Sequence, residues 1–165
     1  LHKKNLLIIG AGGATKGILG PILDVHPASI TISNRSFEKI ALLRERFNSP
    51  LLSFNLLKDL NSDSNLNEYE NTGSFDVIVN ATSSSVSMED SLINPKYFRN
   101  AQLIIDLFYA KKLTSFLRVA KEYGCNNVMD GFPMLVEQAA ESFYIWTGLK
   151  PDTNRIIAKR DVFFE

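Results

Sequence analysis

The sequence has a single cysteine, no net charge and no long apolar run. Because Cys125 is alone, an internal disulfide is excluded, which is typical of a protein in a reducing compartment. The 18 basic residues balance the 18 acidic ones, so bulk charge does not indicate a nucleic-acid or membrane surface. No run approaches the ~20 apolar residues of a membrane span, and the first residues carry no secretory pattern. We therefore expect a cytoplasmic protein with neither a membrane nor a nucleic acid as partner.

What the sequence does contain is an alternation of strand-like and helix-like segments. Apolar and β-branched runs predict strands at 5–10, 29–33, 50–54, 75–82, 101–108 and 126–131. Apolar spacing, caps and breakers predict helices at 13–25, 36–47, 114–123, 133–147 and about 152–159. A short helix and an exposed loop are expected within 55–74 and a further loop at 83–92. Strands that alternate with helices predict an α/β fold, Rossmann-like and doubly wound, with a mostly parallel sheet and helices on both faces. The length and 45% apolar content fit one domain over residues 1–165.

A glycine-rich turn follows the first strand and opens the first helix, which is the setting of a dinucleotide-binding fingerprint. Glycine permits a tight turn and a close ligand, and the helix start offers free N–H groups and a positive dipole end to a phosphate. The match is imperfect, because Thr15 stands at the sixth position, where glycine or alanine is usual. The turn nevertheless suits a phosphate, and the alternative interpretation is a glycine-rich turn such as any α/β protein can contain.

The end of the second strand lacks the acidic residue that binds the ribose 2′-hydroxyl in NAD-binding folds. Asn34 and Arg35 stand there, followed by Ser36 and Lys39. A guanidinium binds a 2′-phosphate through paired N–H donors, whereas a carboxylate would repel it. These residues therefore favour NADP over NAD, and we expect Glu38 in the same turn to point to solvent.

Three later stretches complete the pattern at the carboxyl ends of strands, where ligands of parallel sheets bind. "NATSSS" (80–85) offers small side chains against which a ribose could lie, although a serine-rich loop is the simpler interpretation. "DLFYAKKLTSFL" (106–117) and "DGFPMLVEQAA" (130–140) follow in order. Together with "GAGGAT" (10–15) and "NRSFEK" (34–39), they resemble the C-terminal NADP-binding domain of the shikimate dehydrogenase family over nearly the whole chain.

The resemblance implies a role for each matched position. Gly10 through Ala14 would hold the pyrophosphate, and the adenosine with its 2′-phosphate would contact Asn34, Arg35, Ser36 and Lys39. The ribose and nicotinamide would be lined by Ala81, Thr82, Ser83, Leu107, where the family often has methionine, and the carbonyl of Gly131. Shikimate would be contacted by Tyr109 and Gln138. Pro133 replaces a glycine common in the family, and a proline in the first turn of a helix is sterically acceptable.

The resemblance also implies an activity, the NADPH-dependent reduction of 3-dehydroshikimate to shikimate in aromatic amino-acid biosynthesis. The family's catalytic lysine and aspartate lie in a separate N-terminal domain, which we expect not to precede Leu1. We therefore expect a fragment of a two-domain enzyme that binds NADP(H), meets shikimate or 3-dehydroshikimate at the cleft with the missing domain, and is inactive alone. It would contain no catalytic residue and no metal. Lys111 and Lys112 are the nearest replacement acids, but lysines in such a loop are usually solvated.

Three other interpretations stay open. A quinate/shikimate dehydrogenase relative would share the fold but often prefers NAD, which Arg35 and Lys39 disfavour. The NADP domain of a glutamyl-tRNA reductase shares the glycine turn but lacks the 130–140 stretch. A stand-alone, non-catalytic nucleotide-binding module is the alternative from another class. The adjacent Phe163 and Phe164 predict an apolar partner surface that could support a homodimer.

Overall fold

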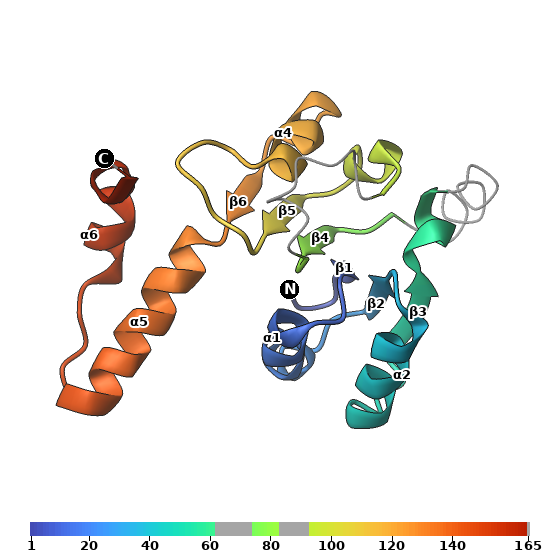
Figure 1. Cartoon of the computed structure of the whole chain (residues 1–165), viewed down its shortest axis with the longest axis horizontal. Helices are drawn as coiled ribbons and strands as arrows, with labels where there is room; N and C mark the ends of the chain where they lie inside the picture. The colour runs from blue at the N-terminus through green and yellow to red at the C-terminus, as the bar shows by residue number, and fades with distance from the viewer. Residues whose placement is uncertain (62–73, 83–92, 165) are drawn as a thin grey trace.

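A six-stranded sheet, all parallel, forms the centre of the computed structural model, which describes residues 1–61, 74–82 and 93–164 (Figure 1). The strand order is β3-β2-β1-β4-β5-β6. The order reverses between β1 and β4, and such a switch point opens a crevice for ligands at the carboxyl ends of the strands. The strands are β1 (Asn5–Ile9), β2 (Ser29–Asn34), β3 (Leu52–Leu56), β4 (Val77–Asn80), β5 (Leu103–Asp106) and β6 (Val128–Asp130).

Helices cover both faces of the sheet, as the doubly wound prediction requires. Successive strand residues point to opposite faces, so Leu6 and Ile8 pack with α1 (Gly13–Asp24) and α2 (Phe37–Arg46). Leu7 and Ile9 belong to the other core. That second core also contains residues of η1 (Leu57–Asn61), η3 (Pro95–Phe98) and α4 (Ser115–Glu122). The prediction of an α/β fold with helices on both faces is confirmed.

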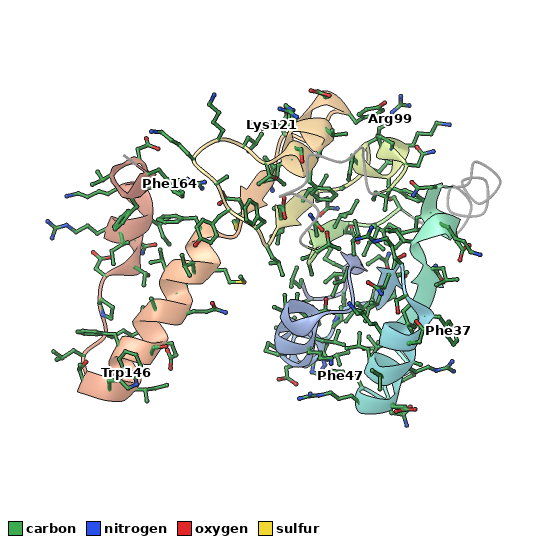
Figure 2. The ribbon with its side chains drawn as sticks, viewed as in Figure 1. Phe37, Phe47, Arg99, Lys121, Trp146 and Phe164 are labelled. Carbon is green, nitrogen blue, oxygen red and sulfur yellow. The ribbon has the colours of Figure 1, made fainter. Side chains whose placement is uncertain are left out.

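The C-terminal elements lie to one side of the sheet (Figure 1). The long helix α5 (Phe132–Thr147) leads away from β6, and α6 (Thr153–Ala158) packs beside it and continues into η4 (Arg160–Phe164). Pro133 stands in the first turn of α5, where its missing N–H leaves no bond unmade. The far end of α5 is apolar and open to solvent, with Trp146 80% exposed (Figure 2). Within the described ranges, the structure contains no helix long and apolar enough to cross a membrane.

Several boundaries differ from those predicted. The third strand begins at Leu52 rather than at residue 50, because a turn in which Leu52 N donates to Ser49 O includes Pro50, and proline has no N–H for a sheet ladder. The fourth, fifth and sixth strands are shorter than predicted at both ends, because the loops on either side of the sheet begin within the predicted ranges. Two short 3-10 helices, η3 and η4, were not predicted. Most of the loops expected at 55–74 and 83–92 lies outside the described residues.

Candidate functional site

The glycine-rich turn is held tightly against the end of β4. Gly10 has a φ of +111°, which favours glycine, and its N–H donates to Ser33 O at 2.7 Å. A Cβ at Gly10 would lie 2.9 Å from the carbonyl oxygen of Ala81. Thr15, at the irregular position of the fingerprint, is fully buried and its hydroxyl donates to Gly10 O at 2.8 Å. The threonine therefore closes the turn by a side-chain hydrogen bond.

The next residues leave room in front of the first helix. A Cβ at Gly12 or Gly13 would meet no heavy atom of the described residues within 4 Å. Gly12 is the N-cap of α1, and no side chain caps this helix. Because the first N–H groups of a helix have no intrahelical partner, those of α1 are available to a ligand, and the helix dipole favours an anion there. Gly13 and Ala14 are exposed at this helix start.

Asn34 joins the end of β2 to the glycine turn. Its Oδ1 accepts from the N–H of Ala11 at 3.3 Å, and its Nδ2 donates to the carbonyl of Ser36 at 3.0 Å. The neighbouring Arg35 and Lys39 are exposed, so their charges are accessible at the rim of the turn. The side-chain amide therefore fixes the geometry of two loops, and the two cations lie beside them.

Ser36 and Glu38 interact at the start of α2. The hydroxyl of Ser36 accepts from Lys39 N at 3.4 Å as the helix cap and donates to a Glu38 carboxylate oxygen at 2.6 Å. This hydrogen bond holds the pKa of Glu38 below its ordinary value. Glu38 is exposed, as predicted, and its carboxylate also accepts a hydrogen bond from the hydroxyl of Ser36.

These residues surround one cavity of about 360 Å³ at the carboxyl ends of β1, β2 and β4. It contains most of the positions predicted for the pyrophosphate, the adenosine and the ribose. Ser83, predicted beside Thr82, lies outside the described residues. The predicted positions that line this adenosine-end cavity are Gly10, Ala11, Gly12, Asn34, Arg35, Ser36, Lys39, Ala81 and Thr82.

Leu107 and Gly131 lie in a different, apolar groove of about 450 Å³, bounded by α1 and by the strands β4, β5 and β6. A Cβ at Gly131 would lie 2.0 Å from the carbonyl oxygen of Leu107. The need for glycine here is therefore explained by the protein's own backbone. The close approach at this position is made by Leu107 and does not by itself indicate a ligand.

Tyr109 and Gln138 line neither cavity. Tyr109 is 37% exposed, and its ring centroid lies 6.4 Å from that of Phe132 and 6.3 Å from that of Phe164. Gln138 is exposed on α5. The structure thus separates the predicted site residues into a group at the β1–β2 end of the sheet edge and a group at the β5–β6 end.

A buried polar network, which the sequence analysis missed, connects these two groups. The carboxylate of Asp106 accepts from Asn80 Nδ2 at 3.1 Å and from the Thr114 hydroxyl at 2.7 Å. Asn80 Oδ1 in turn accepts from the N–H and the hydroxyl of Thr82. Two polar residues that end neighbouring buried strands were the signal that could have identified it, because such strand ends lie side by side in a parallel sheet.

Arg160 was missed as well. Its guanidinium pairs with the carboxylate of Asp130 at the end of β6, and this hydrogen-bonded pair raises the pKa of Arg160. Lys111 and Lys112 are exposed in the loop after β5. Among the described residues, no cluster of three or more His, Cys, Asp or Glu side chains could hold a metal ion.

Comparison with known proteins shows the family. Residues 1–114 match the sequence model described as shikimate / quinate 5-dehydrogenase, and residues 131–159 match the shikimate 5′-dehydrogenase C-terminal domain. A shikimate dehydrogenase (NADP(+)) of Herminiimonas arsenicoxydans is 39% identical over 160 residues, covering 96% of this chain and 54% of that protein. The chain thus spans about half the length of this relative.

Solved structures agree in fold. The crystal structure of an Ael1 enzyme from Pseudomonas putida is 37% identical, with a TM-score of 0.84 over 96% of this chain and 55% of that one. A shikimate dehydrogenase in complex with NADP+ is 28% identical, with a TM-score of 0.73 over 96% and 55%. With a family match over residues 1–114 and this agreement in fold, the chain belongs to the shikimate dehydrogenase family.

Proposed function

We propose that residues 1–165 form the single NADP(H)-binding Rossmann domain of a two-domain oxidoreductase that reduces 3-dehydroshikimate to shikimate. The observation that carries this proposal is the adenosine-end cavity, where Arg35 and Lys39 lie beside a strand that ends in Asn34 instead of a carboxylate. The named activity of the relatives, NADP-dependent shikimate dehydrogenase, supports the same assignment.

The residues present fit this cofactor. The space in front of Gly12 and Gly13 and the uncapped start of α1 suit a pyrophosphate. Arg35 would pair with the 2′-phosphate and Lys39 would add charge, while Ser36 would contribute its hydroxyl. Asn34 would fix the geometry of the glycine turn through its hydrogen bond from the N–H of Ala11. Bound NADPH would supply the hydride.

The remaining residues would serve the reacting end. Ala81, Thr82 and Ser83 would line the ribose, and Leu107 and the carbonyl of Gly131 would contact the nicotinamide. We propose that shikimate is met by Tyr109 and Gln138 at a cleft with a further domain. That domain would supply the proton donor, so the chain by itself would bind the cofactor without turning over substrate. A cytoplasmic location and a homodimer complete the proposal as secondary points.

The decisive experiment is a fluorescence titration of the purified chain with NADPH and with NADH. We expect NADPH to bind more tightly, and we expect Arg35→Ala to weaken NADPH binding about 10-fold to 100-fold, the range for lost hydrogen bonds to a charged group. NADH binding should fall much less. Arg99→Ala, which removes an exposed arginine at the C-terminal end of η3, is the matched control and should leave both affinities unchanged.

Equal affinity for the two cofactors, unaffected by Arg35→Ala, would overturn the 2′-phosphate assignment. Tighter binding of NADH than of NADPH would favour an NAD-preferring quinate/shikimate dehydrogenase. An assay of 3-dehydroshikimate reduction by the same chain tests the proposal that the chain by itself does not turn over substrate. Turnover near that of a complete relative would contradict the proposed inactivity.

A further inference from the structure

The C-terminal segment η4 lies against the carboxyl ends of β5 and β6, and Arg160 is the residue that fastens it there. Its Nη1 donates to Asp130 Oδ1 at 2.7 Å, and its Nη2 pairs with Oδ2. The same Nη2 donates to the carbonyl of Ala110 at 2.6 Å. Asp130 ends β6 and Ala110 lies in the loop after β5. One guanidinium therefore holds together two strand ends and a segment 50 residues further along the chain.

Aromatic rings enclose this contact. The guanidinium carbon lies 5.3 Å from the ring centroid of Phe132 and 5.3 Å from that of Phe164, within the range of cation–π attraction. The Phe164 ring also packs against Tyr109. Figure 2 shows Phe164 turned from η4 toward the start of α5. The Asp130 side chain is only 6% exposed and that of Arg160 is 29% exposed, so the carboxylate is shielded from solvent and the guanidinium is partly shielded.

The groups that Arg160 holds flank two residues of the reacting end. Asp130 Oδ1 also accepts from Phe132 N at 3.2 Å, so this hydrogen bond joins the residues immediately before and after Gly131. Gly131 N donates to Phe108 O at 3.1 Å. Ala110, whose carbonyl accepts from Arg160, is the residue after Tyr109 in the chain. None of the residues that Arg160 contacts lines the adenosine-end cavity.

We infer that Arg160 is a positioning residue for the nicotinamide and substrate end of the site: it fixes the turn at Gly131 and the loop that carries Tyr109. This inference rests on the proposed function, since it concerns where the nicotinamide would lie. It assigns the C-terminal segment a part in the site that neither the glycine fingerprint nor the strand-end residues indicate. Arg160 itself would touch neither cofactor nor substrate.

The test compares two ligands by calorimetry on the purified chain. NADPH carries both ends of the cofactor, whereas adenosine 2′,5′-bisphosphate carries only the end that the adenosine-end cavity would bind. Arg160→Ala should weaken NADPH binding about tenfold, the effect of one well-placed interaction, and should change bisphosphate binding less than about twofold. Arg160→Lys keeps the charge but not the planar fork, so it should restore the NADPH affinity only in part.

Two further measurements separate positioning from general destabilisation. Arg155→Ala removes an exposed arginine on α6 and should leave both affinities unchanged. Hydrogen–deuterium exchange should accelerate in residues 107–114 and 130–135 of Arg160→Ala and stay unchanged in residues 10–16.

Each other outcome is decisive. An equal loss of both ligands would mean that Arg160 stabilises the whole fold, and an unchanged NADPH affinity would mean that it positions nothing at that end; either overturns the inference while the proposed function stands. If the wild-type chain does not bind the bisphosphate, the proposed function itself fails, and the nicotinamide role of Arg160 fails with it.

Discussion

At the β1–β2 end of the sheet edge Gly12 and Gly13 have open space beside them, whereas at the β5–β6 end the backbone of Leu107 lies directly against Gly131. A methyl group added at Gly12 or Gly13 would have no neighbour within 4 Å among the described residues, and the N–H groups behind these glycines are uncapped. Gly131 lies against the carbonyl of Leu107. The space beside Gly12 and Gly13 is open to a ligand, whereas the space on the Cβ side of Gly131 is occupied by the backbone of Leu107.

The charged residues at the two ends differ in the same way. Arg35 and Lys39 are exposed and their charges are accessible. Arg160, in contrast, is paired with a buried aspartate, and its guanidinium packs against aromatic rings. Substitutions of Arg35 and Lys39 should therefore change binding with little effect on folding. Substitutions at the β5–β6 end should change stability and the shape of the site together.

The largest expected effect is that of Gly131→Ala. The added methyl would overlap the backbone of Leu107, at 2.0 Å from its oxygen, and neither strand end can move without breaking sheet hydrogen bonds. We expect a loss of about 3 kcal/mol in the free energy of unfolding, measured by urea denaturation, or failure of the variant to fold. Gly13→Ala is the matched substitution at the other end. It should keep or slightly raise stability, since it places alanine in an open helix start.

Equal stability of the two variants would contradict the comparison directly. It would mean that the β5–β6 end can rearrange as freely as the glycine turn. A binding measurement on Gly13→Ala completes the pair: its NADPH affinity should fall, because the methyl group would enter the space that a pyrophosphate needs.

The second comparison concerns two helix caps. Thr114 accepts from Leu117 N at 3.3 Å and donates to the buried Asp106, whereas Ser36 caps α2 at the exposed end. Thr114→Val should lower the free energy of unfolding by about 2 kcal/mol. The buried carboxylate of Asp106 would lose a hydrogen-bond donor, and α4 would lose its N-cap. Ser36→Ala should lower it by about 0.5–1 kcal/mol. Thermal denaturation of both variants checks the ranking, and a larger loss for Ser36→Ala would reverse our assignment of the packed end.

The same contrast explains what the sequence could predict. The glycine turn, its helix and the basic residues after β2 are local patterns, and a parallel sheet necessarily brings them to one edge. Leu107 and Gly131 could be placed at strand ends for the same reason. The pairing of Asp130 with Arg160 could not, because it depends on how α5 and α6 fold back over 30 residues.

Other differences between the predictions and the structure arise from local interactions that the sequence pattern does not reveal. A glycine at position 131, before a helix, can mark a close approach to the backbone, but the sequence does not say whether a ligand or the chain approaches. The 3-10 helices are too short to show a period, so nothing in the spacing of Pro95–Phe98 or Arg160–Phe164 indicates a helix. Thr15 breaks the fingerprint yet closes the turn, which only the position of its hydroxyl reveals.

A smaller effect is expected at Glu38, which lies among the basic residues of the exposed end. Glu38→Gln removes a negative charge near the proposed 2′-phosphate, so it should tighten NADPH binding about twofold to fivefold and leave NADH binding unchanged. Because the Ser36 hydrogen bond lowers the pKa of Glu38, the stabilisation from this bond is present above the ordinary pKa and is lost as the pH falls through the lowered one.

A titration of the Glu38 carboxyl group, monitored by nuclear magnetic resonance, checks that the Ser36 hydrogen bond lowers its pKa. The pKa of Glu38 should rise toward its ordinary value in Ser36→Ala. If it does not move, the hydrogen bond is absent in solution and Ser36 is free to face the phosphate. An NADH affinity that changes as much as the NADPH affinity in Glu38→Gln would show that the carboxylate does not lie near the 2′-phosphate.

The smallest expected effect is at Cys125, which lies before β6, away from both groups of site residues. Its thiol is buried, with Sγ 3.3 Å from Ala101 O, and burial raises its pKa. A raised pKa lowers the thiolate fraction, so a thiol reagent at pH 8 should react at least about tenfold more slowly with the native chain than with the unfolded chain. Arg35→Ala and Arg160→Ala should both leave this rate unchanged, since each acts locally at its own end of the sheet edge. Faster labelling in Arg160→Ala alone would instead show that the packed end stabilises β6 as a whole, and the two ends would then differ in their contribution to folding as well as in their contribution to binding.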